Sequence, residues 1–341
     1  MYSRIRVTSI RHLLLLGFLA ARVAWGAEPV LYQKLECGSV VSYNPLSLYL
    51  NTAFDTAQIP SSFSQEKFFS RHGKLFNRLK SPAARIEEEG GWGRFFREEF
   101  FGVPSIPNWT LHIVGGGYDC RYLSEWYAER GLPTPYLLAF LTTYLADVGN
   151  EALETSAANV RATDHIADLF FFDPVGKVLF LNDDVAGFFQ NQLQMRAWPL
   201  QPMVNVNDWR IQNAGANWIF RPKWFGDVWR PFLHMGVLVL AGASHRITPS
   251  DSLSLGVGMV PTDPRKFKGD VVAGLYWDRD DSLLTSLTIN GTSDLAFRVN
   301  VYPGVVRFQN WHIGVFAGYS KTSQALLGLN VSLPVGVSAS F

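Results

Sequence analysis

The sequence predicts an α+β protein in which an N-terminal helical domain is followed by an antiparallel up-and-down β-barrel of about eight strands. From about Asn44 to Gln194 the apolar residues recur with the spacing of helix faces, and from about Met203 onward they alternate with a period of two. The two patterns meet at a proline-marked segment, Trp198-Pro199-Leu200-Gln201-Pro202. We therefore expect a helical domain over residues 28–200 and a β-domain over residues 201–341.

The first residues have the features of a secretory signal peptide. Basic residues at Arg4, Arg6 and Arg11 precede the apolar run Leu13–Ala21, and Ala24-Trp25-Gly26 places small residues where a signal peptidase cleaves. The run is too short to cross a bilayer, which needs about 20 apolar residues. We expect residues 1–27 to be removed on export.

Composition narrows the class of protein. Hydrophobic residues make up 48% of the chain and charged residues 17%, against about 25% charged in ordinary soluble domains. The net charge is +1, and no basic tract is interleaved with aromatic residues, so nucleic acid is not an expected partner. The two cysteines, Cys37 and Cys120, could pair in an oxidising compartment or remain two buried thiols; the sequence leaves both open.

The β-domain has strands with one apolar face and one small or polar face. In the last segment, residues 325–341, nearly all of the large apolar side chains fall on odd positions and Gly, Ser and Asn fall between them. The same alternation recurs upstream, and further strands fit at 231–245, 270–278, 311–319 and, more weakly, 204–220. Short turns such as Asn290-Gly291 join them, which is typical of a meander of hairpins.

The pattern is compatible with a soluble sandwich or lipocalin-like barrel, but three features favour a membrane barrel. The chain carries an export signal, the small side of each strand lacks Lys and Glu, and an alternating strand ends on Phe341. This ending resembles the C-terminal signature of bacterial outer-membrane β-barrels. The resemblance implies a location in the bacterial outer membrane, with its lipid and the barrel assembly machinery as partners and the helical domain facing the periplasm.

The helical half carries an acidic run on otherwise apolar helices. Asp147, Glu151 and Glu154 are spaced to share one helical face, and Asp164 and Asp168 follow one turn apart. Carboxylates stacked this way repel one another and lose hydration, so they need compensation. The candidates are Arg121, Arg161, His112, His165 or a metal ion.

Three interpretations of the run remain open: a structural polar network, an exposed acidic face, or a metal or acid–base site. For the third, the candidate catalytic residues are His112, Glu151 and Asp168, and the candidate metal ligands are Glu151, Glu154, Asp164 and Asp168. No organic cofactor is expected, and a divalent metal is the one candidate. Gly115-Gly116-Gly117 lacks the context of a phosphate loop and predicts close helix contact instead.

Three short motifs in this region resemble known families. They are Asn150-Glu151-x-x-Glu154, Thr163-Asp164-x-x-x-Asp168 and Pro174-x-Gly176, and together they resemble the Glu…Asp…Gly motif of the VanZ-like membrane family. The run looks closer still to an uncharacterised bacterial outer-membrane family with an upstream Asn-x-x-x-His segment, here Asn108 to His112. Neither family supplies an established reaction, and the apolar helix here is shorter than a VanZ-like transmembrane helix.

These observations predict an outer-membrane protein with a structural or lipid-handling role in the cell envelope and no turnover. The alternative is a metal-assisted or acid–base enzyme that acts on a lipid or cell-wall precursor through the acidic run.

Overall fold

The computed structural model describes residues 29–102, 105–263, 268–292, 294–309, 311–331 and 335–341. All of its described helices except the short 3-10 turn at 223–225 end by Gln192, and its first strand begins at Arg196, so the α+β class and the order of the two halves are confirmed. Residues 1–27, for which the sequence predicts a signal peptide, lie outside the described residues.

The helical elements are short except for one. They are α2 (Ser39–Ser42), α3 (Pro45–Ala53), η1 (Asp55–Gln58), α4 (Phe68–Leu79), α5 (Pro82–Glu88), α6 (Gly91–Phe95), η2 (Phe96–Phe100), α7 (Ser105–Trp109), η3 (Thr110–Gly116), α8 (Gly117–Glu129), α9 (Pro135–Glu154), α10 (Ala162–Ala167), η4 (Asp168–Phe172), α11 (Asp173–Leu179), α12 (Asp183–Gly187), η5 (Phe188–Gln192) and η6 (Lys223–Phe225). Among the described residues, no helix combines the length and apolar character needed to span a bilayer.

The strands form a single sheet in the order β1-β4-β5-β6-β7-β8-β9-β10-β11-β12-β13-β2-β3. Their bounds are β1 (Arg196–Ala197), β2 (Met203–Asn205), β3 (Ile211–Gln212), β4 (Trp218–Phe220), β5 (Trp229–Met235), β6 (Val239–Arg246), β7 (Asp251–Asp263), β8 (Lys268–Arg279), β9 (Ser282–Ile289), β10 (Leu295–Phe308), β11 (Trp311–Ser320), β12 (Ala325–Asn330) and β13 (Gly336–Ser340). Each pair is antiparallel except β13 with β2, which is parallel.

The sheet corrects the predicted count of about eight strands, because it has thirteen. Residues 231–245 contain the antiparallel pair β5–β6, and residues 325–330 and 336–340 form the antiparallel pair β12–β13. In both pairs odd residues lie opposite odd residues, as Leu327 does opposite Ala339, so odd positions point to the same face in both strands. When odd positions keep the same face in two successive strands, the sequence pattern is that of one long strand.

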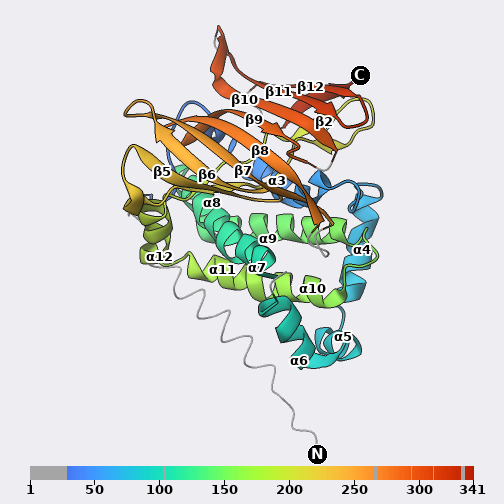
Figure 1. Cartoon of the computed structure of the whole chain (residues 1–341). Helices are drawn as coiled ribbons and strands as arrows, with labels where there is room; N and C mark the ends of the chain where they lie inside the picture. Colours follow the sequence, from blue (N-terminus) through green and yellow to red (C-terminus); the bar gives the residue numbers. More distant parts are fainter. Residues whose placement is uncertain (1–28, 103–104, 264–267, 293, 310, 332–334) are drawn as a thin grey trace, which may run out of the picture.

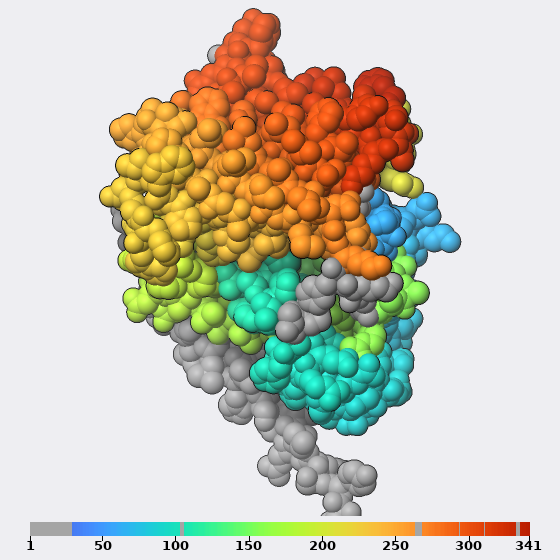
Figure 2. All heavy atoms as spheres, in the orientation of Figure 1, coloured from blue at the N-terminus to red at the C-terminus, as the bar shows by residue number. Residues whose placement is uncertain are grey.

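The two faces of the sheet differ sharply in character. The exposed outer face carries large apolar side chains on successive strands: Val239, Leu253, Leu255, Val257, Met259, Val271, Leu275, Leu287, Ile289, Phe297, Tyr319, Leu327, Leu329 and Val337. The buried inner face carries mainly small and polar residues, among them Ser254, Ser286, Thr288, Arg298, Asn300 and Ser338. Figure 2 shows the outer surface as a shell, coloured yellow to red, above the green and cyan helical part.

The helices are layered beneath the sheet. Figure 1 shows α3, α8 and α9 next to the sheet, with α10 and α11 on the far side of α9. The segment before α3 also ties the two halves together, because the N–H of Gly38 donates to the carbonyl of Pro303 (2.8 Å) and the hydroxyl of Ser282 donates to the carbonyl of Cys37 (2.8 Å). Cys37 and Cys120 are both free thiols.

A largely buried ion-pair network joins the ends of several strands of the sheet. The guanidinium of Arg221 binds both carboxylate oxygens of Asp278, at 2.8 and 3.1 Å, and also Asp281 at 2.5 Å. Arg196 reaches the same Asp281 from β1 (2.7 Å). Because these charges are buried and paired, the network holds the ends of β4, β8 and β9 in one arrangement.

Candidate functional site

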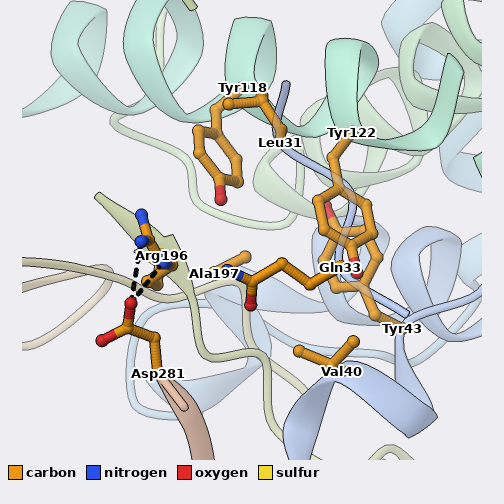
Figure 3. A pocket seen from close by; sticks show the side chains of 9 residues that line it. All are labelled: Leu31, Gln33, Val40, Tyr43, Tyr118, Tyr122, Arg196, Ala197 and Asp281. Atoms are coloured by element: carbon orange, nitrogen blue, oxygen red, sulfur yellow. Dashed lines mark hydrogen bonds and ion pairs between the residues drawn. The ribbon is translucent and has the colours of Figure 1, made fainter. Parts of the chain in front are cut away.

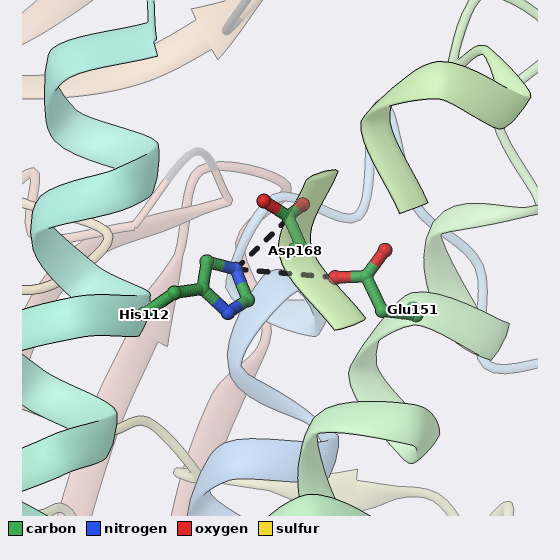
Figure 4. A group of neighbouring side chains, drawn as sticks. All are labelled: His112, Glu151 and Asp168. Atoms are coloured by element: carbon green, nitrogen blue, oxygen red, sulfur yellow. Dashed lines mark ion pairs between the residues drawn. The ribbon is translucent and has the colours of Figure 1, made fainter. Parts of the chain in front are cut away.

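Three helical segments bring together the residues that the sequence singled out. His112 lies in η3 and Asp168 in η4, both π-helical turns, and Glu151 lies in α9. Figure 4 shows the three side chains pointing toward one another from these separate segments. Single π-helical turns inside α-helices are frequent at functional sites, because they rotate a side chain out of the regular helical phase.

Two glycines allow these segments to approach. A Cβ placed on Gly176 would lie 2.3 Å from the carbonyl oxygen of Ile113, and one on Gly117 would lie 2.5 Å from the carbonyl oxygen of Gly176. Any side chain there would separate α11 from η3 and α8. The predicted close helix contact of Gly115-Gly116-Gly117 is therefore confirmed for Gly117. Gly115 instead faces Trp218 of β4, and a Cβ on Gly116 would meet nothing nearer than 3.9 Å.

The three side chains present one atom each to a common point. His112 Nε2 lies 3.9 Å from Glu151 Oε1 and 3.8 Å from Asp168 Oδ2, and all three atoms lie within 4.8 Å of one another. These separations are too long for hydrogen bonds. Ligand atoms that share a tetrahedral metal ion at about 2.1 Å lie about 3.4 Å apart, so the spacing is close to that of a metal site.

The remaining polar atom of each side chain is held by a different neighbour. His112 Nδ1 lies 2.8 Å from Asp173 Oδ1, Glu151 Oε2 lies 2.5 Å from His165 Nδ1, and Asp168 Oδ1 accepts from Asn108 Nδ2 at 2.9 Å. With a metal bound, the carboxylate on Nδ1 would keep one histidine proton there, and the ion would take the place of the proton on Nε2. Supporting partners of this kind are typical of metal centres.

His165 is itself oriented by a second contact. Its Nε2 lies 2.8 Å from Arg78 Nη1, and since arginine can only donate, Nε2 is the acceptor and Nδ1 carries the proton toward Glu151. This leaves Glu151 Oε1 as a buried carboxylate oxygen without a hydrogen-bond partner among the described residues. An unsatisfied buried carboxylate oxygen is costly, and a bound cation would satisfy it.

The electrostatics of the cluster favour a cation. Burial raises the pKa of Glu151 and of Asp168 well above the usual range, and neighbouring carboxylates raise the pKa of Glu151 further. Burial by itself lowers the pKa of His112, but the carboxylates of Asp168 and Asp173 outweigh it and raise that pKa to about 10. The effects of neighbouring carboxylates on Glu151 and His112 indicate concentrated negative charge, whereas burial by itself favours the neutral form of each carboxyl unless a cation is bound.

A buried lysine neutralises the adjacent pair of carboxylates. Lys177 is fully buried, and its Nζ lies 2.6 Å from Asp147 Oδ2 and 3.8 Å from Asp173 Oδ1. Burial raises the pKa of Asp173, but Lys177 and His112 outweigh it, so that carboxyl stays ionised. Lys177 thus balances the negative charge of Asp147 and Asp173. Glu151 and Asp168 are left facing only Nε2 of His112.

The other predicted site residues lie beside this point. Glu154 belongs to a neighbouring group with Glu151 and His165, and its Oε1 accepts from Asn150 (3.1 Å). Asp164 is half-buried and belongs to none of the three metal-capable groups formed by the described residues. Of the predicted compensators, Arg121 pairs with Glu125 and Asp183, and Arg161 with Glu98 and Glu99, so neither reaches the cluster.

Sequence reasoning missed Asp173 and Lys177 as members of the cluster. They lie four residues apart in α11. In the sequence, Lys177 is the one basic residue of a largely apolar segment that begins at Asp173. A lone lysine in such a segment needs a buried partner, and that was the signal to follow.

A separate small pocket lies where α8 meets the N-terminal segment and β1. Figure 3 shows Tyr43, Tyr118 and Tyr122 around it, with the Arg196–Asp281 ion pair at one side. None of the metal-capable groups named above contributes to its lining.

Comparison with known proteins found no match: no protein-family model, no curated protein and no solved structure resembles this chain. The function must therefore be argued from the site itself.

Proposed function

We propose that this protein is an outer-membrane enzyme that binds a divalent metal ion at His112, Glu151 and Asp168 and hydrolyses a lipid or cell-wall precursor. The observation that carries the proposal is the convergence of three ligand atoms, each on a side chain whose other polar atom is held by Asp173, His165 or Asn108.

The donor set suits a transition metal of the envelope. One imidazole and two carboxylates are ligands for Zn²⁺, Mn²⁺ or Fe²⁺, and two carboxylates with a neutral histidine balance a charge of +2. Three protein ligands leave a coordination position for water, and a bound metal lowers the pKa of that water toward neutrality. His112 keeps 12% of its side chain exposed, whereas Glu151 is 0% and Asp168 2% exposed, so His112 is the most accessible of the three proposed ligands.

The sheet supports the location. A soluble sheet hides its apolar face, whereas here the apolar face is exposed and the buried face mixes small and polar residues with a hydrophobic cluster; an exposed apolar face is typical of outer-membrane proteins. Exposed apolar patches beyond a few hundred Å² are rare on soluble monomers, and this one continues across strands β6 to β13.

Closure of the sheet into a barrel is part of this proposal. The terminal strands β1 and β3 belong to one longer hairpin, because Trp198 N–H donates to Asn217 O (2.7 Å) and Leu200 N–H donates to Gly215 O (3.0 Å) between the β1–β4 and β2–β3 ladders. One arm of this hairpin pairs with β5 and the other with β13. We propose that the hairpin closes the ring and so removes the free edges that a bilayer disfavours.

Metal content tests the site. Elemental analysis of purified protein is expected to give about one equivalent of Zn, Mn or Fe per chain. Glu151→Gln and Asp168→Asn should each lower the bound metal at least tenfold, and Glu154→Gln is the matched control that should retain it. Metal-free wild-type protein, or equal loss in the control, would exclude this site.

Turnover is tested separately. Incubating the metal-loaded protein with extracted envelope lipids and lipid-linked cell-wall precursors, followed by mass spectrometry, should reveal a product that EDTA and His112→Ala abolish.

The low exposure of His112 also favours a second candidate, an ion that locks η3, α9 and η4 together in a structural or lipid-handling envelope protein. In that case metal removal lowers the unfolding midpoint but no product forms with any of these lipids.

Location has its own readout. The mature protein should pellet with outer membranes after osmotic shock and migrate differently on gels with and without boiling. Release as a soluble protein would reject the membrane placement and leave the metal test unaffected.

A further inference from the structure

A second buried polar cluster lies on the inner face of the sheet, around Arg298. This residue comes from β10 and is 3% exposed. Its Nη1 donates to Gln58 Oε1 (3.3 Å), while its Nε has no partner among the described residues. No described carboxylate forms an ion pair with it. A buried guanidinium without a counter-charge is strongly unfavourable, so this position calls for an anion.

Two hydroxyl donors lie in the same cross-strand row. Gly274 pairs with Thr288, and Thr288 pairs with Arg298, so the three residues follow one another across β8, β9 and β10 on the inner face. The ring of Tyr276 lies over Gly274, since a Cβ there would meet the Tyr276 hydroxyl at 2.5 Å. The hydroxyls of Tyr276 and Thr288 are both buried and both lack a partner within the described part of the chain.

An amide donor completes the set. Asn300 follows Arg298 by two residues in β10 and shares its face. Its Oδ1 accepts from Asn213 Nδ2 (2.7 Å) and from Gln201 Nε2 (3.4 Å), and these bonds fix which end of the amide is which. The Nδ2 of Asn300 is therefore a donor, and it is buried with no partner among the residues described.

The nearby carboxylate does not neutralise Arg298. Asp55 is reached only through Gln58, whose Nε2 donates to Asp55 Oδ1 (3.1 Å) while its Oε1 accepts from Arg298. The same Asp55 oxygen also accepts from the N–H of Ala216 (2.9 Å). This arrangement points the side-chain carbonyl of Gln58 at Arg298, but a neutral carbonyl does not balance the positive charge of the guanidinium.

We propose that the inner face of the sheet holds a small oxyanion (phosphate, sulfate or a carboxylate group) bound by Arg298, Tyr276, Thr288 and Asn300. Charge-assisted hydrogen bonds from a guanidinium to an oxyanion are among the strongest in proteins, and the three neutral donors fill its remaining oxygens. Ordered water satisfies unpaired donors but cannot balance the charge. The site is separate from the metal centre, which lies in the helical layer.

Anion content and anion-dependent stability test this site on the full mature protein. After extensive dialysis, denaturation should release about one equivalent of phosphate or sulfate, measured by ion chromatography. For protein refolded without these ions, each tenfold rise of inorganic phosphate above its Kd should raise the unfolding midpoint by about 2 °C relative to chloride at equal ionic strength.

The variants separate binding from folding. Tyr276→Phe removes one hydroxyl without changing the ring and should weaken the phosphate dependence about tenfold, and Arg298→Gln should abolish it. Tyr319→Phe is the matched control on the outer face and should behave as wild type. No released anion together with equal midpoints in phosphate and chloride would overturn the proposal, as would phosphate dependence retained in Tyr276→Phe. If Arg298→Gln does not fold, the Tyr276 and Tyr319 pair decides.

Discussion

Replacing Val257 by arginine distinguishes a lipid-facing sheet from a sheet in water. Val257 is the middle residue of β7, its side chain is on the outer face and 54% exposed, and its cross-strand neighbours are Ala241 and Ala273. On a water-exposed surface such a change alters the free energy of unfolding by no more than about 0.5 kcal/mol. At the middle of a bilayer, an arginine on the lipid-facing side of a strand costs about 2–4 kcal/mol.

A cost of about 3 kcal/mol corresponds to a change of roughly 150-fold in the unfolding equilibrium, so the two cases are well separated. The assay is reversible urea unfolding in phospholipid vesicles, followed by tryptophan fluorescence and by the shift on unboiled gels. Ile247→Arg is the matched control: Ile247 is 57% exposed but lies in the turn between β6 and β7. If Val257→Arg and Ile247→Arg change the free energy of unfolding equally, the lipid-facing assignment of the sheet is refuted.

Three further predictions concern the helical half. Burial raises the pKa of Asp119 to about 7, although Tyr43 and Trp218 donate hydrogen bonds to it. The folded state then holds this proton more tightly than the unfolded state, so this carboxyl should lower the stability as pH rises from about 4 to 7, by on the order of 4 kcal/mol. Asp119→Asn should remove this contribution to the pH dependence of the free energy of unfolding, measured by denaturant titrations. An unchanged pH dependence in the variant would contradict the prediction. Lys177→Met leaves Asp147 and Asp173 without their buried cation and should cost about 3–5 kcal/mol, measured by urea unfolding at pH 7; a loss below 1 kcal/mol would mean that the pair is dispensable. Gly176→Ala places a Cβ 2.3 Å from a backbone oxygen and should lower the free energy of unfolding by about 1–3 kcal/mol. Gly187→Ala, whose nearest contact is at 3.8 Å, should leave it unchanged. Equal thermal midpoints of the two variants would show that α11 shifts to accommodate the methyl group without loss of stability.

Much of the β half could be predicted from the alternation of residue types. The outer positions of β7, β8 and β12 are those that the pattern assigned to the apolar face, because side chains on a strand alternate strictly between faces. Two of the additional strands were missed for the same reason: odd residues pair with odd residues in β5–β6 and in β12–β13, so each pair has the pattern of one strand. The others lie among β1 to β4, which are only two or three residues long and too short to show an alternation. The parallel pairing of β13 with β2 brings together segments more than 130 residues apart, and no local pattern encodes such a contact.

The site divides in a similar way. Helical spacing placed Glu151 on one face with other acidic residues, and the residue types offered His112 and Asp168 as candidates for the same site. Spacing could not decide between Asp164 and Asp168, because they lie one turn apart; the structure buries Asp168 beside His112 and leaves Asp164 half-buried outside the cluster. The contact between Gly176 and Ile113, which sets Asp173 against His112, depends on the packing of two helices that are distant in sequence.

The sequence by itself determined the helical-then-strand order, the two-faced strands and the residue types available for a cation site, because these follow from local periodicity and composition. Only the tertiary structure decided which carboxylates share one histidine nitrogen, and that the polar face of the sheet encloses an arginine without a counter-ion. Both depend on distances between segments far apart in the chain, and such distances are set by side-chain packing and glycine contacts rather than by any local pattern.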